Sequence, residues 1–321
     1  MQQIDLMLGI DIGGTKTSFG FVDRQGTMLD ATSIPTQPND SAETFVSRLH
    51  HEIEVLRVGL PSSHCLCGIG IGAPNANHYR GTIEKAVNLN WGQIVDFVAL
   101  IRRHYDLPVS ITNDANAAAI GEMLFGKARG MKHFIVITLG TGLGSGIVTN
   151  GQLLYGASGF AGELGHTVVD PEGRRCRCGK RGCLETYVSA TGLKRTALTL
   201  LAERCDPSPL RAMSYREMTA KRIFYLAAKG DSIAQEAFDR TARILGWKLA
   251  DAVAHVSPEA IFLAGGLAGS GDLLLQPTQR YMDDFLFGVY RGTVQLMLSG
   301  MEAGTSAILG AAALIWNELA L

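Results

Sequence analysis

One stretch of the chain restricts its fold more than any other, because four potential metal ligands lie close together in it. Cys176, Cys178 and Cys183 follow the pattern C-x-C-x4-C, and nine residues separate His166 from the first cysteine. Three thiolates and one imidazole complete the tetrahedral coordination of a structural zinc ion. Glycines among these ligands permit the tight turns that the spacing requires. The pattern therefore predicts a zinc-folded loop, against the alternative of unligated or disulfide-forming thiols.

Two carboxylates flank this stretch. Glu163 and His166 are three residues apart, so one helical turn would place both on the same face, and Glu185 follows the last cysteine by two residues. Carboxylates accept hydrogen bonds from the hydroxyls of a sugar ring, which favours a polar pocket beside the metal. A pair of carboxylates also serves glycoside hydrolases, and this second interpretation stays open from these residues alone.

Three glycine-rich turns follow apolar strands, and none of them matches a standard nucleotide fingerprint. Thr15 stands where a P-loop has lysine, and Ile147 stands where a dinucleotide fold has its last glycine. Glycines still let backbone N–H groups approach phosphate oxygens. The first turn also carries the side chains of Asp11, Thr15 and Lys16. The Asp11 carboxylate suits Mg²⁺ held through water. Together the turns predict a nucleotide site made of Asp11, Gly13, Gly14, Thr15 and Lys16, of Gly140, Thr141, Gly142 and Gly144, and of Gly265 and Gly266.

Asn113 and Asp114 lie directly between an apolar strand at 109–112 and a helical segment at 115–125. Polar groups at the C-terminal end of a strand are where α/β folds place their chemistry. An aspartate at this point is equally typical of a helix N-cap. The local sequence leaves both roles open for Asp114.

The order of strands and helices predicts a mixed α/β fold. A meander at 6–12, 17–22 and 27–31 precedes a helix that starts at the capping pair Asp40 and Glu43. The later elements are a strand at 66–71, a helix at 94–105, a strand at 133–139 with a second at 147–149, a helix at 232–255, a strand at 260–264 and a helix at 306–321. Strand, glycine turn and strand occur twice, which indicates an internal duplication. We expect a domain boundary near residue 118.

Composition excludes several classes of protein. The 321 residues are 46% apolar and 18% charged, with a net charge of −1, so nothing indicates nucleic-acid or membrane binding. The N-terminal residues lack the pattern of a signal peptide, and no apolar run is long enough to span a bilayer. Six cysteines without an export signal favour a reducing compartment, and we expect a cytoplasmic protein.

With these residues assembled, the chain resembles the ROK family (repressor, open reading frame, kinase) of sugar kinases over nearly its whole length. The matching motifs are D-I-G-G-T-K at 11–16, N-D at 113–114, L-G-T-G-L-G-S-G at 139–146, E-L-G-H at 163–166, C-R-C-G-K-R-G-C-L-E at 176–185 and A-G-G-L at 264–267. The resemblance implies a two-domain actin/hexokinase-like (ribonuclease H-like) fold with an interdomain cleft. It implies a small domain at 1–117 plus about 306–321, a large zinc-carrying domain at 118–305, and a homodimer.

The resemblance also implies a function and a set of roles. The chain is most similar to the bacterial glucokinases of the family, which implies transfer of the ATP γ-phosphoryl group to a hexose, with ATP, Mg²⁺ and a structural Zn²⁺ as cofactors. Asp114 would be the general base, and the glycine turns would line the ATP site. Sugar hydroxyls would be held by Asn113, Asp114, Glu163, His166 and Glu185, and zinc by His166, Cys176, Cys178 and Cys183.

Other functions remain to be separated from this one. N-acetylglucosamine, N-acetylmannosamine or several hexoses would be alternative substrates within the kinase class. A sugar-responsive transcriptional repressor is a further alternative, although only ten residues precede Asp11, too few for a helix-turn-helix domain. A glycoside hydrolase would leave Asp114 and the three glycine turns unexplained.

Overall fold

The computed structural model describes residues 3–86, 88–302 and 304–319. The chain forms two compact units, each of which is described here by itself. Unit 1 consists of Met1–Met131, Gln152–Gly162 and Gly300–Leu321, and unit 2 of Lys132–Gly151 and Glu163–Ser299. Within the described residues, no helix combines the length and the apolar character needed to cross a membrane.

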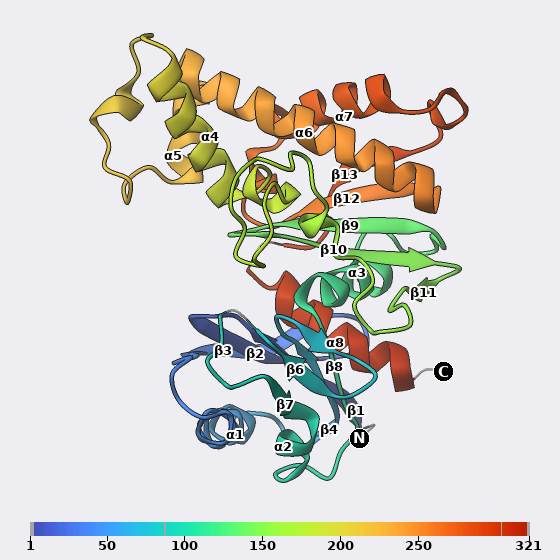
Figure 1. Ribbon diagram of the computed structural model, residues 1–321. Coiled ribbons are helices and arrows are strands. Elements are labelled where there is room, and N and C mark those ends of the chain that lie inside the picture. The colour runs from blue at the N-terminus through green and yellow to red at the C-terminus, as the bar shows by residue number, and fades with distance from the viewer. Residues whose placement is uncertain (1–2, 87, 303, 320–321) are drawn as a thin grey trace. The chain divides into compact units, whose positions relative to one another are not determined.

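Unit 1 is built on a five-stranded sheet with the strand order β3-β2-β1-β4-β8 (Figure 1). Strands β1, β2 and β3 form an antiparallel meander, while β1, β4 and β8 run parallel. The elements of this unit are β1 (Ile4–Ile12), β2 (Lys16–Val22), β3 (Met28–Pro35), α1 (Ala42–Val58), β4 (His64–Gly72), β5 (Ala76–Asn77), β6 (Thr82–Glu84), β7 (Ile94–Asp96), α2 (Phe97–Arg102), β8 (Val109–Thr112), α3 (Asp114–Leu124), β11 (Gln152–Leu153) and α8 (Ser306–Leu319).

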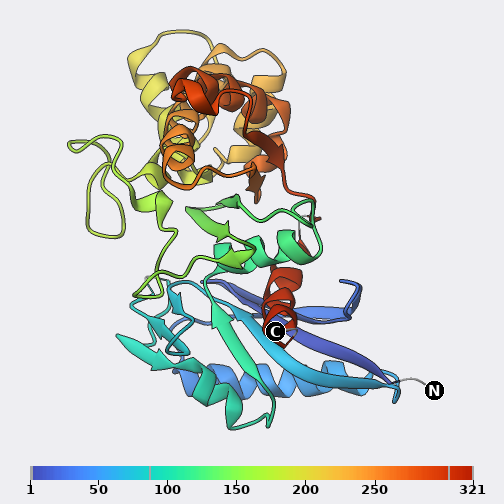
Figure 2. The same cartoon turned by 90° about the vertical axis from the view of Figure 1, so that its right-hand side faces the viewer.

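Helices cover both faces of this sheet, because alternate residues of β1 point to opposite sides. Leu8 and Ile10 belong to the core that contains α1 and α2, whereas Met7 packs with α8. Figure 2 shows α1 and α8 on opposite faces of the sheet. Glycines on the α8 side bring the helix very close, since a Cβ atom on Gly9 or Gly70 would overlap backbone atoms of α8.

Two local expectations for unit 1 need correction. The N-cap of α1 is Ser41, whose hydroxyl accepts the Thr44 N–H, and not Asp40. Asp40 instead pairs with Arg48 at 3.2 Å. The helix predicted at 94–105 is only six residues long, because its first part forms β7 in a small sheet with β5 and β6.

The division of the chain also differs from the boundary expected near residue 118. That position lies inside α3, and the whole helix belongs to unit 1. The reason is its packing on α8, where a Cβ atom on Gly310 would stand 2.6 Å from the Ala117 carbonyl oxygen. The two units are also similar in length, rather than one small and one large. The predicted C-terminal helix at 306–321 is α8, and the last two predicted residues lie outside the described ones.

Unit 2 contains a second sheet in which four of its strands follow the order β10-β9-β12-β13. Strands β9 and β10 are antiparallel, and β9, β12 and β13 are parallel. The elements are β9 (Phe134–Leu139), β10 (Leu143–Thr149), the 3-10 turns η1 (Leu164–His166), η2 (Leu184–Thr186), η3 (Pro209–Ala212), η4 (Ala268–Ser270) and η5 (Gly288–Tyr290), α4 (Ala190–Glu203), α5 (Ala220–Ala228), α6 (Ser232–Val256), β12 (Ala260–Ala264), α7 (Asp272–Phe285) and β13 (Gln295–Leu298).

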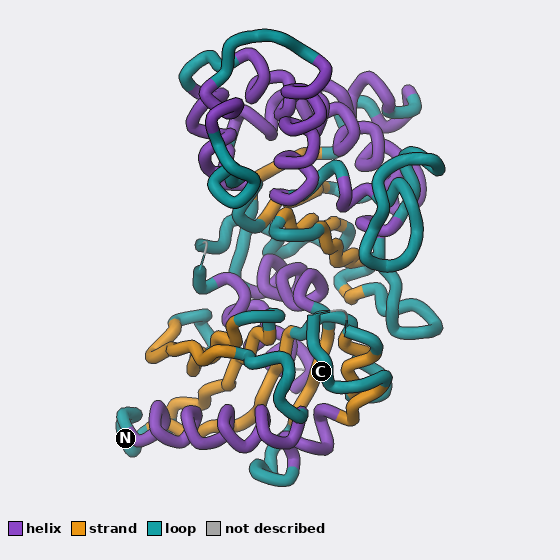
Figure 3. The backbone as a smooth tube through the Cα atoms, turned by 60° about the vertical axis from the view of Figure 1, so that its left-hand side comes forward, coloured by secondary structure: helices purple, strands orange, loops and turns teal. Residues whose placement is uncertain are grey.

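The predicted duplication is present in the topology. The order β10-β9-β12-β13 repeats β2-β1-β4-β8, with the same pattern of antiparallel and parallel pairs. In unit 2 the sheet residues Ile135 and Ile137 share a core with α6, in which Phe238, Leu245 and Leu249 are buried. Figure 3 shows the helices of this unit gathered on one side of its strands. Helix α6 corresponds to the helix predicted at 232–255.

Candidate active site and metal centre

Two aspartates of unit 1 are brought together by its parallel strands. Because β1, β4 and β8 run in the same direction, their C-terminal ends share one edge of the sheet. Asp11 pairs with Gly72 at the end of β4, Gly72 pairs with Thr112, and Asp114 follows β8 two residues later. A Cβ atom on Gly72 would stand 3.7 Å from Asp11 Oδ1 and 3.8 Å from the Cα atom of Asp114. Because Gly72 has no side chain, only its backbone lies between the two aspartates.

The N-cap of α3 is Asn113 and not Asp114. The Asn113 side chain accepts the Asn116 N–H at 2.6 Å, whereas Asp114 is the first helical residue and its Oδ1 accepts the Ala115 N–H at 2.8 Å. The capping hypothesis for Asp114 is therefore wrong. Capping occupies the Oδ1 atom of Asn113, while Asp114 keeps Oδ2 for another partner.

Both aspartates are stronger bases than an ordinary carboxylate. Burial, together with repulsion from Asp114, raises the pKa of Asp11 to about 7, and Lys16 opposes the rise. The side chain of Asp114 is accessible to solvent. Desolvation by the surrounding protein nevertheless raises its pKa, and the hydrogen bond from the Ala115 N–H opposes this rise. A carboxylate with a raised pKa accepts a proton more readily near neutral pH.

The first glycine turn is fixed by hydrogen bonds to a threonine of a distant segment. The Gly13 N–H donates to the Lys16 carbonyl at 3.0 Å, which closes the turn. Thr36 donates its N–H to the Thr15 carbonyl at 3.0 Å and its hydroxyl to the Gly13 carbonyl at 2.7 Å. These bonds hold the backbone of 13–16 in one conformation beside Asp11.

The two glycine turns of unit 2 lie at the same end of its sheet. The Gly140 N–H donates to the Gly142 carbonyl at 3.0 Å, directly after β9. Gly265 follows β12 with a φ of +86°, and the Leu267 N–H donates to the Leu139 carbonyl at 3.0 Å. The structure thus joins the second and third turns within unit 2.

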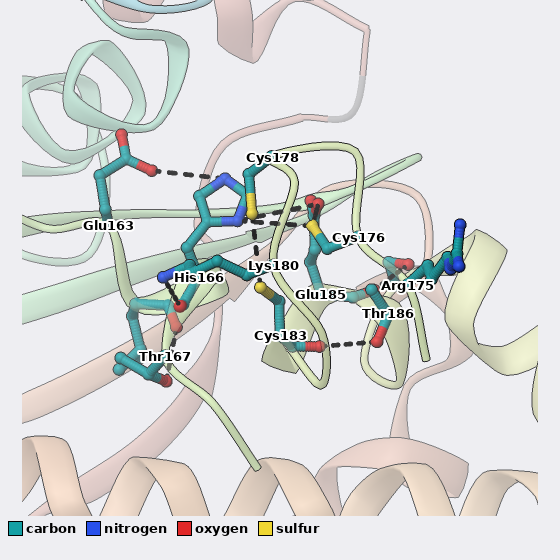
Figure 4. Close-up of polar contacts among 12 residues, drawn as sticks. Glu163, His166, Thr167, Arg175, Cys176, Cys178, Lys180, Cys183, Glu185 and Thr186 are labelled. Atoms are coloured by element: carbon teal, nitrogen blue, oxygen red, sulfur yellow. Dashed lines mark hydrogen bonds and ion pairs between the residues drawn. The ribbon is translucent and has the colours of Figure 1, made fainter. Parts of the chain in front are cut away.

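The four predicted metal ligands converge in unit 2 (Figure 4). The ligand atoms of His166, Cys176, Cys178 and Cys183 all lie within 4.8 Å of one another. The Sγ atoms of Cys178 and Cys183 are 3.5 Å apart, and Cys176 Sγ is 3.7 Å from His166 Nδ1. Zinc–sulfur bonds of about 2.3 Å in a tetrahedron place sulfurs roughly 3.8 Å apart, so these distances fit zinc.

His166 lies between the two carboxylates. Glu163 Oε2 is 3.9 Å from His166 Nε2, and Glu185 Oε1 is 3.9 Å from Nδ1 and 3.0 Å from Cys176 Sγ. Nδ1 therefore faces the metal ligands, and Nε2 faces Glu163, as Figure 4 shows. A Cβ atom on Gly142 would stand 2.6 Å from Glu185 Oε2, so the glycine turn and the metal loop are in contact.

Three residues that support the site were not found from the sequence. Arg174 holds the metal loop on unit 2: its guanidinium donates to the Thr186 carbonyl at 2.8 Å, and burial lowers its pKa to about 10. The others are Thr36 and Gly72. A basic residue within an R-R-C-R-C run gives no signal that it is an anchor. The strand predicted at 66–71 ends one residue before Gly72, which is the last residue of β4.

The duplicated sheet, with a glycine turn in each copy and a histidine–cysteine cluster in the second, defines an α/β protein of the actin- and hexokinase-like class. The chain belongs to the ROK family, whose model matches residues 7–318. This family membership was predicted from the motifs.

The chain is similar to two glucokinases and to a repressor. The chain is 37% identical over 284 residues to a glucokinase of Halalkalibacterium halodurans, covering 87% of this chain and 85% of that one. It is similar to the crystal structure of a ROK family glucokinase from Streptomyces griseus in complex with glucose and AMPPNP, at 34% identity and a TM-score of 0.82, covering 96% and 98%. It is 28% identical to a putative xylose repressor of Caldicellulosiruptor, covering 99% and 80%.

Proposed function

We propose that the chain is an ATP-dependent glucokinase that transfers the γ-phosphoryl group of ATP to glucose, with Asp114 as the general base. The observation that carries the proposal is the placement of Asp114. Asn113 takes over the capping of α3, so the Asp114 carboxylate is available at the sheet edge beside Asp11. The solved and curated glucokinases to which the chain is similar support the substrates.

The reaction needs little from the protein except positioning and charge. Phosphoryl transfer passes through a loose transition state, and a sugar hydroxyl is too weak an acid to ionise beforehand. Asp114 orients the hydroxyl through a hydrogen bond and accepts its proton as the new O–P bond forms. Its raised pKa suits it to this late transfer.

The nucleotide is assigned to the glycine turns. The N–H groups of Gly13 and Gly140 are already bonded within their turns, so other backbone N–H groups of the turns would donate to phosphate oxygens, and Lys16 would add a positive charge. Bound Mg²⁺ would neutralise phosphate charge, and Asp11 would hold it through water. The pKa of Asp11 implies that it gives up a proton as the cation binds.

The sugar is assigned to Asn113, Asp114, Glu163, His166 and Glu185. Bound zinc would supply rigidity to the loop from His166 to Cys183 without taking part in phosphoryl transfer. With Nδ1 facing the metal ligands, Nε2 of His166 is the nitrogen left for a sugar hydroxyl. Both carboxylates approach the same imidazole from its two nitrogens, so the ring occupies the space that a glycosidic bond would need between them. This geometry disfavours a glycoside hydrolase.

We also propose that the protein acts as a homodimer in the cytoplasm. Cysteines that bind zinc must stay reduced, which a reducing compartment ensures. Light scattering on the purified protein tests the dimer.

A hexose panel tests the proposed function. ADP release is measured with glucose, mannose, N-acetylglucosamine and N-acetylmannosamine, each with ATP and Mg²⁺. We expect the highest kcat/KM with glucose. A preference for an N-acetylated sugar would move the assignment to a hexosamine kinase, and the absence of ADP release with every sugar, together with sugar-dependent binding to operator DNA, would favour a repressor.

A further inference from the structure

Unit 1 contains a polar cavity that the proposed reaction does not use. It has a volume of about 560 Å³, within the roughly 300–1,000 Å³ of small-molecule sites. Its wall is formed by α2, the loop before β6, the edge strand β8 and the C-terminal helix α8. Side chains that line it include His78, Tyr79, Arg102, Arg103, Ser110 and Glu318.

Two arginines that line this cavity form no ion pair among the described residues. Arg102 and Arg103 end α2 and are exposed. In the part of the chain that the structure describes, neither guanidinium has a hydrogen bond or an ion pair, whereas the third arginine, Arg80, is paired with Glu84 at 2.8 Å. Neighbouring guanidinium groups with free donors match the oxygens of a phosphate group.

The rest of the wall suits the hydroxyls and the ring of a sugar. Tyr79 is 61% exposed, and its ring lies 5.8 Å from that of His78, so it offers an aromatic face. The His78 ring is held flat by Tyr155, at a centroid distance of 4.1 Å and an interplanar angle of 7°. Glu318 supplies acceptor oxygens for hydroxyl donors, and Asp96 supplies others at the start of α2.

The polar groups of the wall are already arranged by contacts with one another. Ser110 donates its hydroxyl to Glu318 Oε1 at 2.6 Å, and His78 Nδ1 lies 3.3 Å from the Ile111 carbonyl and 3.6 Å from Glu318 Oε1. Nδ1 is thus engaged on the protein side, and among the described residues none hydrogen-bonds Nε2. This part of the wall, unlike the two arginines, is therefore preorganised, which lowers the cost of binding.

We propose that this cavity is a second binding site, which takes a small sugar phosphate with its phosphate on Arg102 and Arg103 and its ring near Tyr79 and Glu318. The site also includes a strand that leads directly to the proposed general base. Ser110 belongs to β8, whose last residue is followed directly by Asn113 and Asp114. A ligand that competes for Glu318 changes the contacts of this strand four residues before the proposed base.

The test is calorimetric titration of the full chain with glucose 6-phosphate and, in a separate arm, inorganic phosphate. Glucose and a non-hydrolysable ATP analogue are present at saturation so that the proposed catalytic site is occupied. We expect one equivalent of glucose 6-phosphate to bind to the wild type, and inorganic phosphate to bind more weakly. Arg102→Ala/Arg103→Ala should weaken glucose 6-phosphate binding about tenfold or more.

Arg57→Ala provides the matched control, because Arg57 is an exposed arginine of the same unit that lies on α1 outside the cavity. It should bind like the wild type. Hydrogen exchange should show protection at residues 78–81 and 96–111 when glucose 6-phosphate is added. The proposal is overturned by the absence of binding, by equal binding in the double variant, by equal losses in the control, or by protection elsewhere only.

The effect on activity is a separate readout. Without added sugar phosphate, the double variant should keep the wild-type kcat, since neither arginine belongs to the proposed catalytic site. Added glucose 6-phosphate should change the kcat or KM of the wild type and not of the double variant. If the hexose panel fails while titration and exchange succeed, the proposed function falls and the binding site stands; the opposite result removes only the site.

Discussion

At the scale of single residues, the candidate site depends on which of two adjacent side chains caps helix α3. Asn113 caps α3 and Asp114 does not, although the two are adjacent and both residue types are good caps. The sequence motif placed them at the right strand end. It left the division of roles open, because only the backbone angles of residue 113 decide which side chain reaches the N–H of residue 116.

Asp114→Asn should lower kcat by about 10²–10⁴-fold, the usual contribution of a general base. The amide keeps the size of the side chain and loses the ability to accept the proton, so sugar binding should change little. Steady-state kinetics and sugar titration separate the two effects. Wild-type kcat in this variant would remove Asp114 from the mechanism.

The pKa of Asp11 makes a prediction about stability. It is about 7 in the folded protein against 3.8 normally, because burial and Asp114 disfavour the charged form. The folded state therefore binds more protons between these values, and the free energy of unfolding falls as the pH rises from about 4 to about 7. Asp11→Asn removes this loss. Over that window the free energy of unfolding of the variant should therefore rise by up to about 4 kcal/mol relative to that of the wild type.

Urea unfolding at several pH values between 5 and 8, without Mg²⁺, checks this change. The difference between Asp11→Asn and the wild type should grow up to about pH 7 and then stay constant. Two stability curves that run parallel across this range would contradict a raised pKa for Asp11 in the folded protein.

At the scale of elements, the metal loop has little regular structure of its own. Between η1 and η2 it is held by turns, by Arg174 and by the cysteine–histidine cluster. Such a loop has few apolar contacts to stabilise it, so metal binding should contribute much of its order.

Cys178→Ser should therefore lower the zinc content below one ion per chain, weaken sugar binding and make the 166–183 loop easier to cleave by protease. Cys205→Ser is the matched control, since Cys205 is also exposed but lies outside the cluster. Metal analysis and limited proteolysis measure both effects. A zinc-free protein with full sugar affinity and a protected loop would show that the metal has no structural role.

At the scale of the whole molecule, the end of the chain completes the fold of its beginning. Helix α8 packs on β1 and β4 of unit 1 through glycines, so that its backbone touches theirs. The close approach is possible only because Gly9 and Gly70 have no side chains on that face. The fold of unit 1 therefore depends on residues from both ends of the sequence.

Gly70→Ala should destabilise unit 1 by about 1–3 kcal/mol or more, as overpacking does, because the new methyl group overlaps the Ala311 carbonyl. Gly59→Ala is a suitable control: this glycine has a φ of −73°, and its Cβ atom would meet only an ordinary contact of 3.5 Å. Thermal unfolding should give a lower Tm for Gly70→Ala alone. Equal Tm values for the two variants would mean that α8 adjusts freely.

The sequence by itself determined the long strands of the two sheets, the long helix at 232–255, the duplication, the family and the grouping of one histidine with three cysteines, because these depend on local periodicity and on short, specific spacings. It did not predict the short strands β5, β6, β7, β11 and β13, which lack such a pattern. It also selected the candidate site residues, whose roles remain proposals. Only the tertiary structure decided that α3 belongs to unit 1, that Asn113 is the cap, and that Thr36, Gly72 and Arg174 support the site. These features arise from contacts between residues far apart in the chain, and no local pattern encodes such contacts.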